Sequence, residues 1–284
     1  MSAVKTGILM FAIFGLLLFV GSFFGKGGLI TAFVIALAMN GFAYWFSDKV
    51  VLFMYHAREV TPEQEPRLHA LVRTLVERAG LPMPKLYIME NPSPNAFATG
   101  RSPKHAAVAV TTGILQLLPE DQLSGVLAHE LSHVEHRDIL IATVAATIAG
   151  TISFLAMLAR FSLIFGGGDD RRGRGGNPIA LLVIAIVAPL AAMFIQLWIS
   201  RTREYAADAR GAQIAQNPLL LARALQGLER GVQRTPMEAG PATAHFFIVA
   251  PFSAKTMLSW MSTHPQIEDR VARLEKMAEA QGIR

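Results

Sequence analysis

Four long apolar blocks constrain the fold of this 284-residue chain more than any other feature. A block of about 18 to 20 apolar residues, once helical, crosses a hydrocarbon core of about 30 Å. The first two blocks carry no charged residue, the third has Arg160 near its far end, and the fourth contains Pro189. We therefore predict a mainly α-helical integral membrane protein, with Arg160 reaching towards the headgroups. The blocks are residues 7–24, 29–46, 139–165 and 179–199.

The blocks divide the chain into four parts. Residues 1–47 are expected to form an N-terminal transmembrane hairpin. No Ala-x-Ala cleavage site follows the first block, and a second block begins at once, so we expect no signal peptide here. Residues 48–138 and 201–284 are polar and are predicted to form the two parts of one further domain. Residues 139–200 form a second apolar hairpin, whose Gly- and Arg-rich loop 166–177 is expected to be disordered.

The polar parts contain patterns of both helix and strand. An amphipathic helix is predicted over 61–80, with Thr61 as its cap and Pro62 at its first turn. Residues 85–90 and 106–113 are predicted strands, and 91–105 a loop or an irregular edge. Further helices are expected after Pro119, along 201–215, over 218–231 and from Pro265 to the end.

The motif LAHELSHVEHRD, residues 127–138, indicates a metal site. His129 and His133 are four residues apart, so on a helix both lie on one face and can bind one zinc ion. Glu130 lies between them and is placed to act as general base. His136 lies about 10 Å from His129 along the helix axis, too far to share the ion. We therefore expect His136 at the surface or beside a ligand.

The third ligand must come from elsewhere in the chain. Glu204 and Asp208, in the stretch REYAAD, share a helix face one turn apart. Glu204 could bind the metal and Asp208 could fix the tautomer of a ligand histidine. Spacing alone equally allows a solvated helix face. Other candidates are the remaining acidic residues and His56, His69, His105, His245 and His264.

HELSH at 129–133 and REYAAD at 203–208, with an apolar hairpin between them, resemble the HtpX family of membrane metalloproteases. That family is related to the CAAX prenyl endopeptidases and to Oma-type proteases. The likeness covers nearly the whole chain and includes NAFATG at 95–100, VAVTTGIL at 108–115, HRD at 136–138 and STHP at 262–265. It implies transmembrane helices joined to a zincin-like α+β metalloprotease domain with a small sheet.

The resemblance also assigns roles to individual residues. It makes Glu204 the third ligand of one zinc ion per chain, with Asp208 beside the ligands. The family pattern His-x5-Arg falls on His264 and Arg270 and implies that they hold the substrate carbonyl oxygen. The segment Asn95, Ala96, Phe97 and Ala98 lies next to a strand, so it is either an ordinary turn or an edge that pairs with an extended peptide.

Proteolytic quality control of damaged membrane proteins is the function that the resemblance implies. A prenyl-protein processing enzyme is one alternative, although four spans provide little room for a lipid chamber. A non-catalytic scaffold with structural zinc is another, but such sites are usually rich in cysteine and this chain has none.

Charge indicates the partners and the orientation. The net charge is +5, and no basic stripe interleaved with aromatic residues indicates nucleic-acid binding. We expect polypeptide substrates, a lipid bilayer and no nucleic acid. Lys and Arg near the span ends favour a site facing the cytoplasm of a bacterial inner membrane, by seven residues to four. On the site side are Lys5, Lys49, Arg58, Arg137, Arg201, Arg203 and Arg210, and on the other Lys26, Arg171, Arg172 and Arg174.

Overall fold

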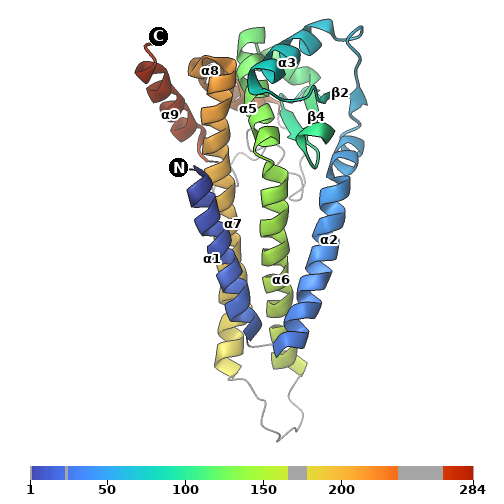
Figure 1. Cartoon of the computed structure of the whole chain (residues 1–284), viewed down its shortest axis with the longest axis vertical. Helices are drawn as coiled ribbons and strands as arrows, with labels where there is room; N and C mark the ends of the chain where they lie inside the picture. Colours follow the sequence, from blue (N-terminus) through green and yellow to red (C-terminus); the bar gives the residue numbers. More distant parts are fainter. Residues whose placement is uncertain (1, 23–24, 166–177, 236–264, 284) are drawn as a thin grey trace, which may run out of the picture. The chain divides into compact units, whose positions relative to one another are not determined.

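A computed structural model describes residues 2–22, 25–165, 178–235 and 265–283 of the chain. Within these residues the structure is mainly helical and contains one small sheet (Figure 1). The predicted disordered loop 166–177 and the candidate residue His264 lie outside the described ranges. The chain divides into two compact units, residues 1–44 with 140–202 and residues 45–139 with 203–284.

Three helices of the first unit supply the buried residues of its apolar core. These are α1 (Ser2–Ser22), α6 (Asp138–Phe165) and α7 (Pro178–Ala215), the last continuing into the second unit. Their outer surfaces are also apolar, since large side chains such as Phe11, Ile186 and Trp198 are exposed. Apolar residues on both faces of a helix bundle are typical of a membrane environment. The core includes Ile13, Leu17, Val20, Ile148, Ile152, Leu155, Ile184 and Ala188.

Two described helices are long and apolar enough to cross a membrane, over Asp138–Phe161 and Leu182–Ala215. Helix α1 contains a shorter apolar stretch, Phe11–Val20, and α2 (Gly25–Met54) follows it. The two later spans therefore have the helical form that the sequence predicts. The N-terminal pair of spans stays a prediction.

Arg160 makes a specific contact with the neighbouring helix α7. Pro189 lies inside α7 and has no backbone N–H, so it leaves the carbonyl of Ala185, four residues earlier, without its helical donor. The guanidinium of Arg160 donates to this carbonyl oxygen, from Nε at 3.2 Å and from Nη2 at 2.8 Å. A charged side chain of α6 thus supplies the hydrogen bond that Pro189 removes from the carbonyl of Ala185 in α7.

The second unit encloses a four-stranded sheet with strand order β1-β2-β4-β3. Strand β2 (Lys85–Met89) is parallel to β4 (Ala107–Thr111), and β1 (Arg58–Glu59) lies antiparallel to β2. Strand β3 (Ala96–Thr99) runs antiparallel to β4 and forms an edge of the sheet. The predicted strands are confirmed, and the predicted loop over 91–105 contains this edge strand as well as the short helix η1 (Pro103–His105).

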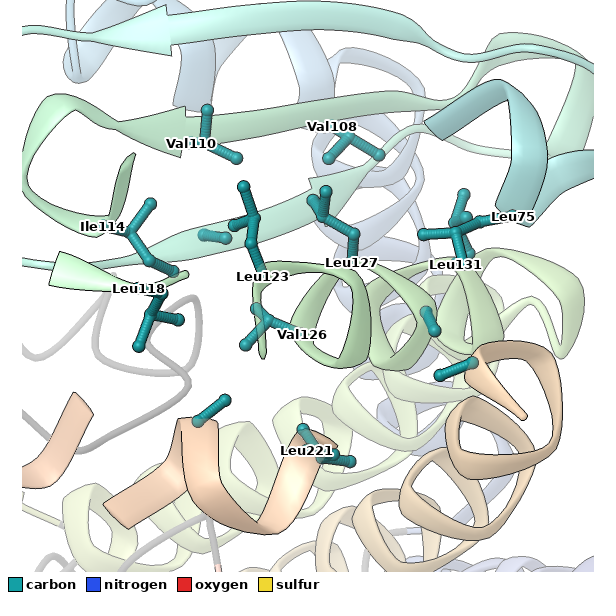
Figure 2. Close-up of a cluster of buried hydrophobic side chains, with 14 of the residues drawn as sticks. Leu75, Val108, Val110, Ile114, Leu118, Leu123, Val126, Leu127, Leu131 and Leu221 are labelled. Carbon is teal, nitrogen blue, oxygen red and sulfur yellow. The ribbon is translucent and has the colours of Figure 1, made fainter. Parts of the chain in front are cut away.

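Helices cover the sheet and bury one continuous apolar core. They are α3 (Pro66–Ala79), α4 (Thr112–Leu117), α5 (Glu120–Glu135), α8 (Pro218–Arg234) and α9 (Ile267–Ala280). Figure 2 shows α5 between the sheet and α8: Leu127 points towards Val108 of β4, and Val126 points towards Leu221 of α8. Because α5 is packed on both sides, its remaining face is held in one orientation.

Two predicted helix starts are wrong. Helix α3 begins at Pro66, because the chain first makes a turn in which the carbonyl of Thr61 accepts from the amides of Gln64 and Glu65. Proline at the first helical turn was the correct signal, but it was assigned to Pro62 in place of Pro66. Helix α9 begins at Ile267, two residues after Pro265, and its first turn carries Glu268 and Asp269. Helix α8 extends past the predicted end to Arg234.

Replacing Arg160 by Ala should destabilise the bundle by roughly 0.5–2 kcal/mol, the range for hydrogen bonds between membrane helices. In a Pro189→Ala background the destabilisation by Arg160→Ala should be smaller, since the backbone N–H of the new alanine can donate to the carbonyl of Ala185. Unfolding free energies of the four proteins in detergent form a double-mutant cycle. Arg234→Ala, at an exposed position of α8, is the control. If Arg160→Ala lowers the unfolding free energy equally in both backgrounds, Arg160 does not compensate for the missing N–H of Pro189.

Candidate metal centre

Helix α5 presents His129, Glu130 and His133 on the face turned away from the core. It begins after Pro119, with Glu120 and Asp121 in its first turn, as the sequence predicts. His129 is 2% exposed and Glu130 6% exposed, while the side chain of His133 in the last turn is 20% exposed. The metal-binding motif thus lies at the end of a helix that is otherwise a core element.

Helix α7 brings Glu204 and Asp208 against α5. Both carboxylates are buried, so the alternative of a solvated helix face is excluded. Gly211 lies on the same helix, where a Cβ atom would come within 2.8 Å of the backbone N and Cα of His129. Only glycine fits at that distance, and this close approach lets the two helices place their side chains around one point.

The donor atoms of His129, His133 and Glu204 converge. The two histidine Nε2 atoms are 3.2 Å apart, Glu204 Oε2 is 3.7 Å from Nε2 of His129, and Glu204 Oε1 is 3.5 Å from Nε2 of His133. Ligands about 2.0–2.1 Å from one tetrahedral zinc ion are separated by about 3.3 Å. Within the described ranges this is the one group of histidine and acidic residues with metal-binding geometry.

Each of the two histidines has an aspartate behind it. Asp208 Oδ1 is 3.1 Å from Nδ1 of His129, and Asp138 Oδ2 is 2.7 Å from Nδ1 of His133. A carboxylate at Nδ1 holds the proton there and leaves the lone pair on Nε2. With both rings in this tautomer, the two Nε2 lone pairs and the Glu204 carboxylate would face one point, which suits a bound cation. The donor set therefore fits zinc.

Buried arginines neutralise these aspartates. Arg270 is 0% exposed and donates to Asp208 from Nε at 2.9 Å and from Nη2 at 2.7 Å. Its Nη1 lies 3.4 Å from Glu204 Oε2, and these carboxylates raise the pKa of Arg270 although burial lowers it. Arg203 contacts Oδ1 of Asp138 through Nε and Nη2.

Glu130 faces the edge strand and the metal ligands together. Its Oε2 accepts a hydrogen bond of 2.8 Å from the backbone N–H of Ala98 in β3. Burial raises the pKa of the Glu130 carboxyl, and the neighbouring histidines and the Ala98 N–H oppose that rise. For His133, burial lowers the pKa, but Asp138 and Glu204 outweigh it and raise the pKa to about 9.

The remaining predicted residues lie as follows. Ala96, Phe97 and Ala98 are in β3, and Asn95 precedes it with its carbonyl bonded to the amide of Thr111. This segment is therefore a strand edge and no simple turn. His136 is exposed, as expected, and its Nδ1 lies 2.9 Å from the carbonyl of Ser132.

Two of the other candidate histidines within the described residues, His69 and His105, have partners outside this cluster, whereas His245 and His264 lie outside the described residues. Nε2 of His69 is 2.9 Å from the carbonyl of Val60, and Nδ1 of His105 is 2.9 Å from Ser102 Oγ. A small recess adjoins His133 and the end of β3. Besides His133 it is lined by Ala98, Gly100, Arg101, Ser102, Val134, Arg137 and Ile139.

Sequence reasoning missed three residues of the site: Asp138, Arg203 and Gly211. Asp138 lies five residues after His133 and directly precedes the apolar block 139–165. A carboxylate near the end of a metal-binding helix is a recognisable signal for a residue behind the ligand. From sequence, Arg203 counts only as one of the basic residues near the span ends that indicate the orientation in the membrane. Gly211 lies in no recognisable sequence pattern.

Two histidines and a carboxylate that converge beside a buried glutamate form the donor set of a mononuclear zinc hydrolase. Comparisons with known proteins identify the class more narrowly. Residues 62–278 match the model of peptidase family M48. A protease HtpX homolog of Thermodesulfovibrio yellowstonii is 55% identical over 98% of this chain and 99% of its own length. A protease HtpX homolog of Pyrococcus furiosus is 51% identical over 99% of this chain and 97% of its own length.

The chain therefore belongs to peptidase family M48, and its resemblance to the HtpX family is confirmed. It is a membrane metallopeptidase. Among solved structures, the S. mikatae Ste24p crystal structure superposes with a TM-score of 0.61 over 96% of this chain, at 19% identity. The chain spans 65% of the length of that protein, and the likeness shows a common fold.

Gly211→Ala should weaken zinc retention and destabilise the second unit by about 1–3 kcal/mol, because the new Cβ must push α7 away from the backbone of His129. Gly227→Ala on α8 is the matched control, since its Cβ would meet only the ends of the Leu118 and Gln122 side chains, at 3.3 and 4.0 Å. Zinc content and thermal unfolding of both proteins are the measurements. Full zinc retention in Gly211→Ala would show that the close approach does not position the ligands.

Proposed function

We propose that His129, His133 and Glu204 bind one zinc ion and that Glu130 is the general base of peptide-bond hydrolysis. The convergence of the three donor atoms, with separations of 3.2 to 3.7 Å, is the observation that carries the proposal. When bound, zinc supplies a Lewis acid at this point. The aspartates behind the two histidines keep the rings turned towards it.

Glu130 has the environment that a proton carrier needs. Its carboxyl is buried, and burial raises its pKa towards the range in which a carboxylate both accepts and returns a proton. It takes a proton from the attacking water and delivers it to the leaving amine. The N–H of Ala98 holds Glu130 in place meanwhile. Arg270 and His264 are proposed to hold the carbonyl oxygen of the substrate, Arg270 also keeping Asp208 against His129.

The edge of the sheet is proposed as the substrate-binding strand. Strand β3 pairs with β4 on one side, and the amide of Ala98 is directed to Glu130 on the other. An extended peptide added along residues 95–98 would lie beside the zinc ligands. Main-chain pairing tolerates many sequences, which suits degradation of misfolded membrane proteins, the role we propose.

The proposed setting is a bacterial inner membrane that the chain crosses several times, with the site on the cytoplasmic face. His133 and Glu204 meet at one centre, so the hairpin between them either crosses the membrane an even number of times or dips in and returns, and two crossings are consistent with this setting. The positive charges near the span ends support the orientation.

Glu130→Gln should keep one zinc ion per chain and lose at least about 100-fold in casein cleavage, since it removes the base but no ligand. Glu204→Ala should lose zinc and activity together. Zinc content and the rate of casein degradation by the purified full chain are the measurements. If the zinc-loaded wild type cleaves only prenylated peptides, the specific processing function is supported instead. If it cleaves neither casein nor prenylated peptides, the non-catalytic scaffold is supported. Wild-type cleavage by Glu130→Gln would exclude Glu130 as the base.

A cysteine introduced at Asp169 should be labelled by membrane-impermeant maleimide from the periplasmic side of intact cells. A cysteine at exposed Gln233 of α8 should be labelled only after the membrane is opened. The chain has no cysteine of its own, so each label reports one site. Labelling of both positions under the same condition would contradict a hairpin that crosses the membrane.

A further inference from the structure

His133 is the more loosely held of the two histidines. Its side chain is 20% exposed, against 2% for His129, and it lies in the last turn of α5. The last turn of a helix frays most easily, because its carbonyls have no partners within the helix. Something outside α5 must therefore hold this ring for the metal site to keep its geometry.

The turn after α5 returns a carboxylate to His133. Arg137 has a left-handed backbone with φ of 53°, uncommon for a residue other than glycine. This turn ends α5 and starts α6 at Asp138. It directs Oδ2 of Asp138 to Nδ1 of His133 at 2.7 Å, so the first side chain of the membrane helix supports a proposed zinc ligand.

Arg203 completes this contact from the other end of the hairpin. Its guanidinium binds Oδ1 of Asp138, the oxygen that His133 does not use. The side chains of Arg203 and Asp138 are 9% and 11% exposed, so the ion pair is largely shielded from water. Arg203 also directly precedes Glu204, the proposed third ligand, on α7.

We propose that Asp138 and Arg203 are positioning residues that hold His133 and join the start of α6 to α7 at the metal centre. Asp138 fixes the Nδ1 proton of His133, and Arg203 fixes Asp138. Because this one ion pair links the start of α6 to α7 and holds the carboxylate behind His133, separation of the two helices at this level would weaken the support of that ring. The inference rests on the proposed zinc ligands and deepens that function.

The chain offers a matched control pair. Arg210 of α7 binds Glu135 of α5 at 2.8 Å, with side chains 31% and 28% exposed. This pair also joins a residue near the end of α5 to α7, but its carboxylate contacts neither histidine ligand in any hydrogen bond or ion pair of the described residues. Glu135→Ala and Arg210→Met therefore test the loss of a similar ion pair without loss of support for His133.

Zinc affinity of the full chain in detergent, measured by competition with a chelator, tests the proposal. Asp138→Ala should weaken zinc binding about 10- to 100-fold, as is usual when the partner of a ligand histidine is removed. Arg203→Met should weaken it less, and Arg203→Lys should restore part of the loss. Glu135→Ala and Arg210→Met should stay within about threefold of wild type.

The visible spectrum of the cobalt-substituted protein gives a second readout that does not require activity. It should change in Asp138→Ala and Arg203→Met and remain that of the wild type in both controls, because it reports ligand geometry. If Asp138→Ala does not fold, Asp138→Asn and the Arg203 series are measured instead. Wild-type affinity and spectrum in folded Asp138 and Arg203 variants would overturn the inference. Absence of peptidase activity in the zinc-loaded wild type would refute the proposed function and leave this affinity test intact.

Discussion

The proposed metal centre depends on the requirement that two imidazole rings, one buried and one partly exposed, turn their Nε2 lone pairs to the same point. Such an arrangement is unfavourable unless each ring has an acceptor behind it and a cation in front of it. Asp208 and Asp138 are the acceptors, and each is in turn neutralised by a buried arginine. These four residues come from α6, α7 and α9, so the fold must bring three segments to α5 before the histidines can bind metal.

The packing of the second unit meets this requirement. Helix α5 lies between the sheet and α8, and Gly125 and Gly211 let α8 and α7 approach its backbone closely. At Gly125 a Cβ would lie 2.6 Å from the amide nitrogen of Leu221. The precision of the site therefore comes from glycines and apolar contacts as much as from the charged residues.

Local patterns predicted the elements well and the contacts between them poorly. The helical spacing of His129 and His133 and the buried face of α3 follow from periodicities of a few residues. The pairing of Asp138 with Arg203 joins positions 65 residues apart and leaves no periodic signal. Resemblance located Glu204 and Asp208, since spacing alone left a solvated face open. Pro62 and Pro66 carry the same helix-start signal, and only the turn at Thr61 decides between them.

The hydrogen bond from Ala98 to Glu130 has a consequence for how a peptide would be cut. It joins the main chain of the edge strand directly to the proposed base, because the donor is the backbone N–H of Ala98 and no side chain of the strand takes part. A peptide aligned on that strand would have its register set by backbone steps of about 3.3 Å, so the cleaved bond would be chosen by position along the strand. If peptides bind along this strand as proposed, substrates would be selected by whether a segment is extended and accessible, which unfolding alone can provide.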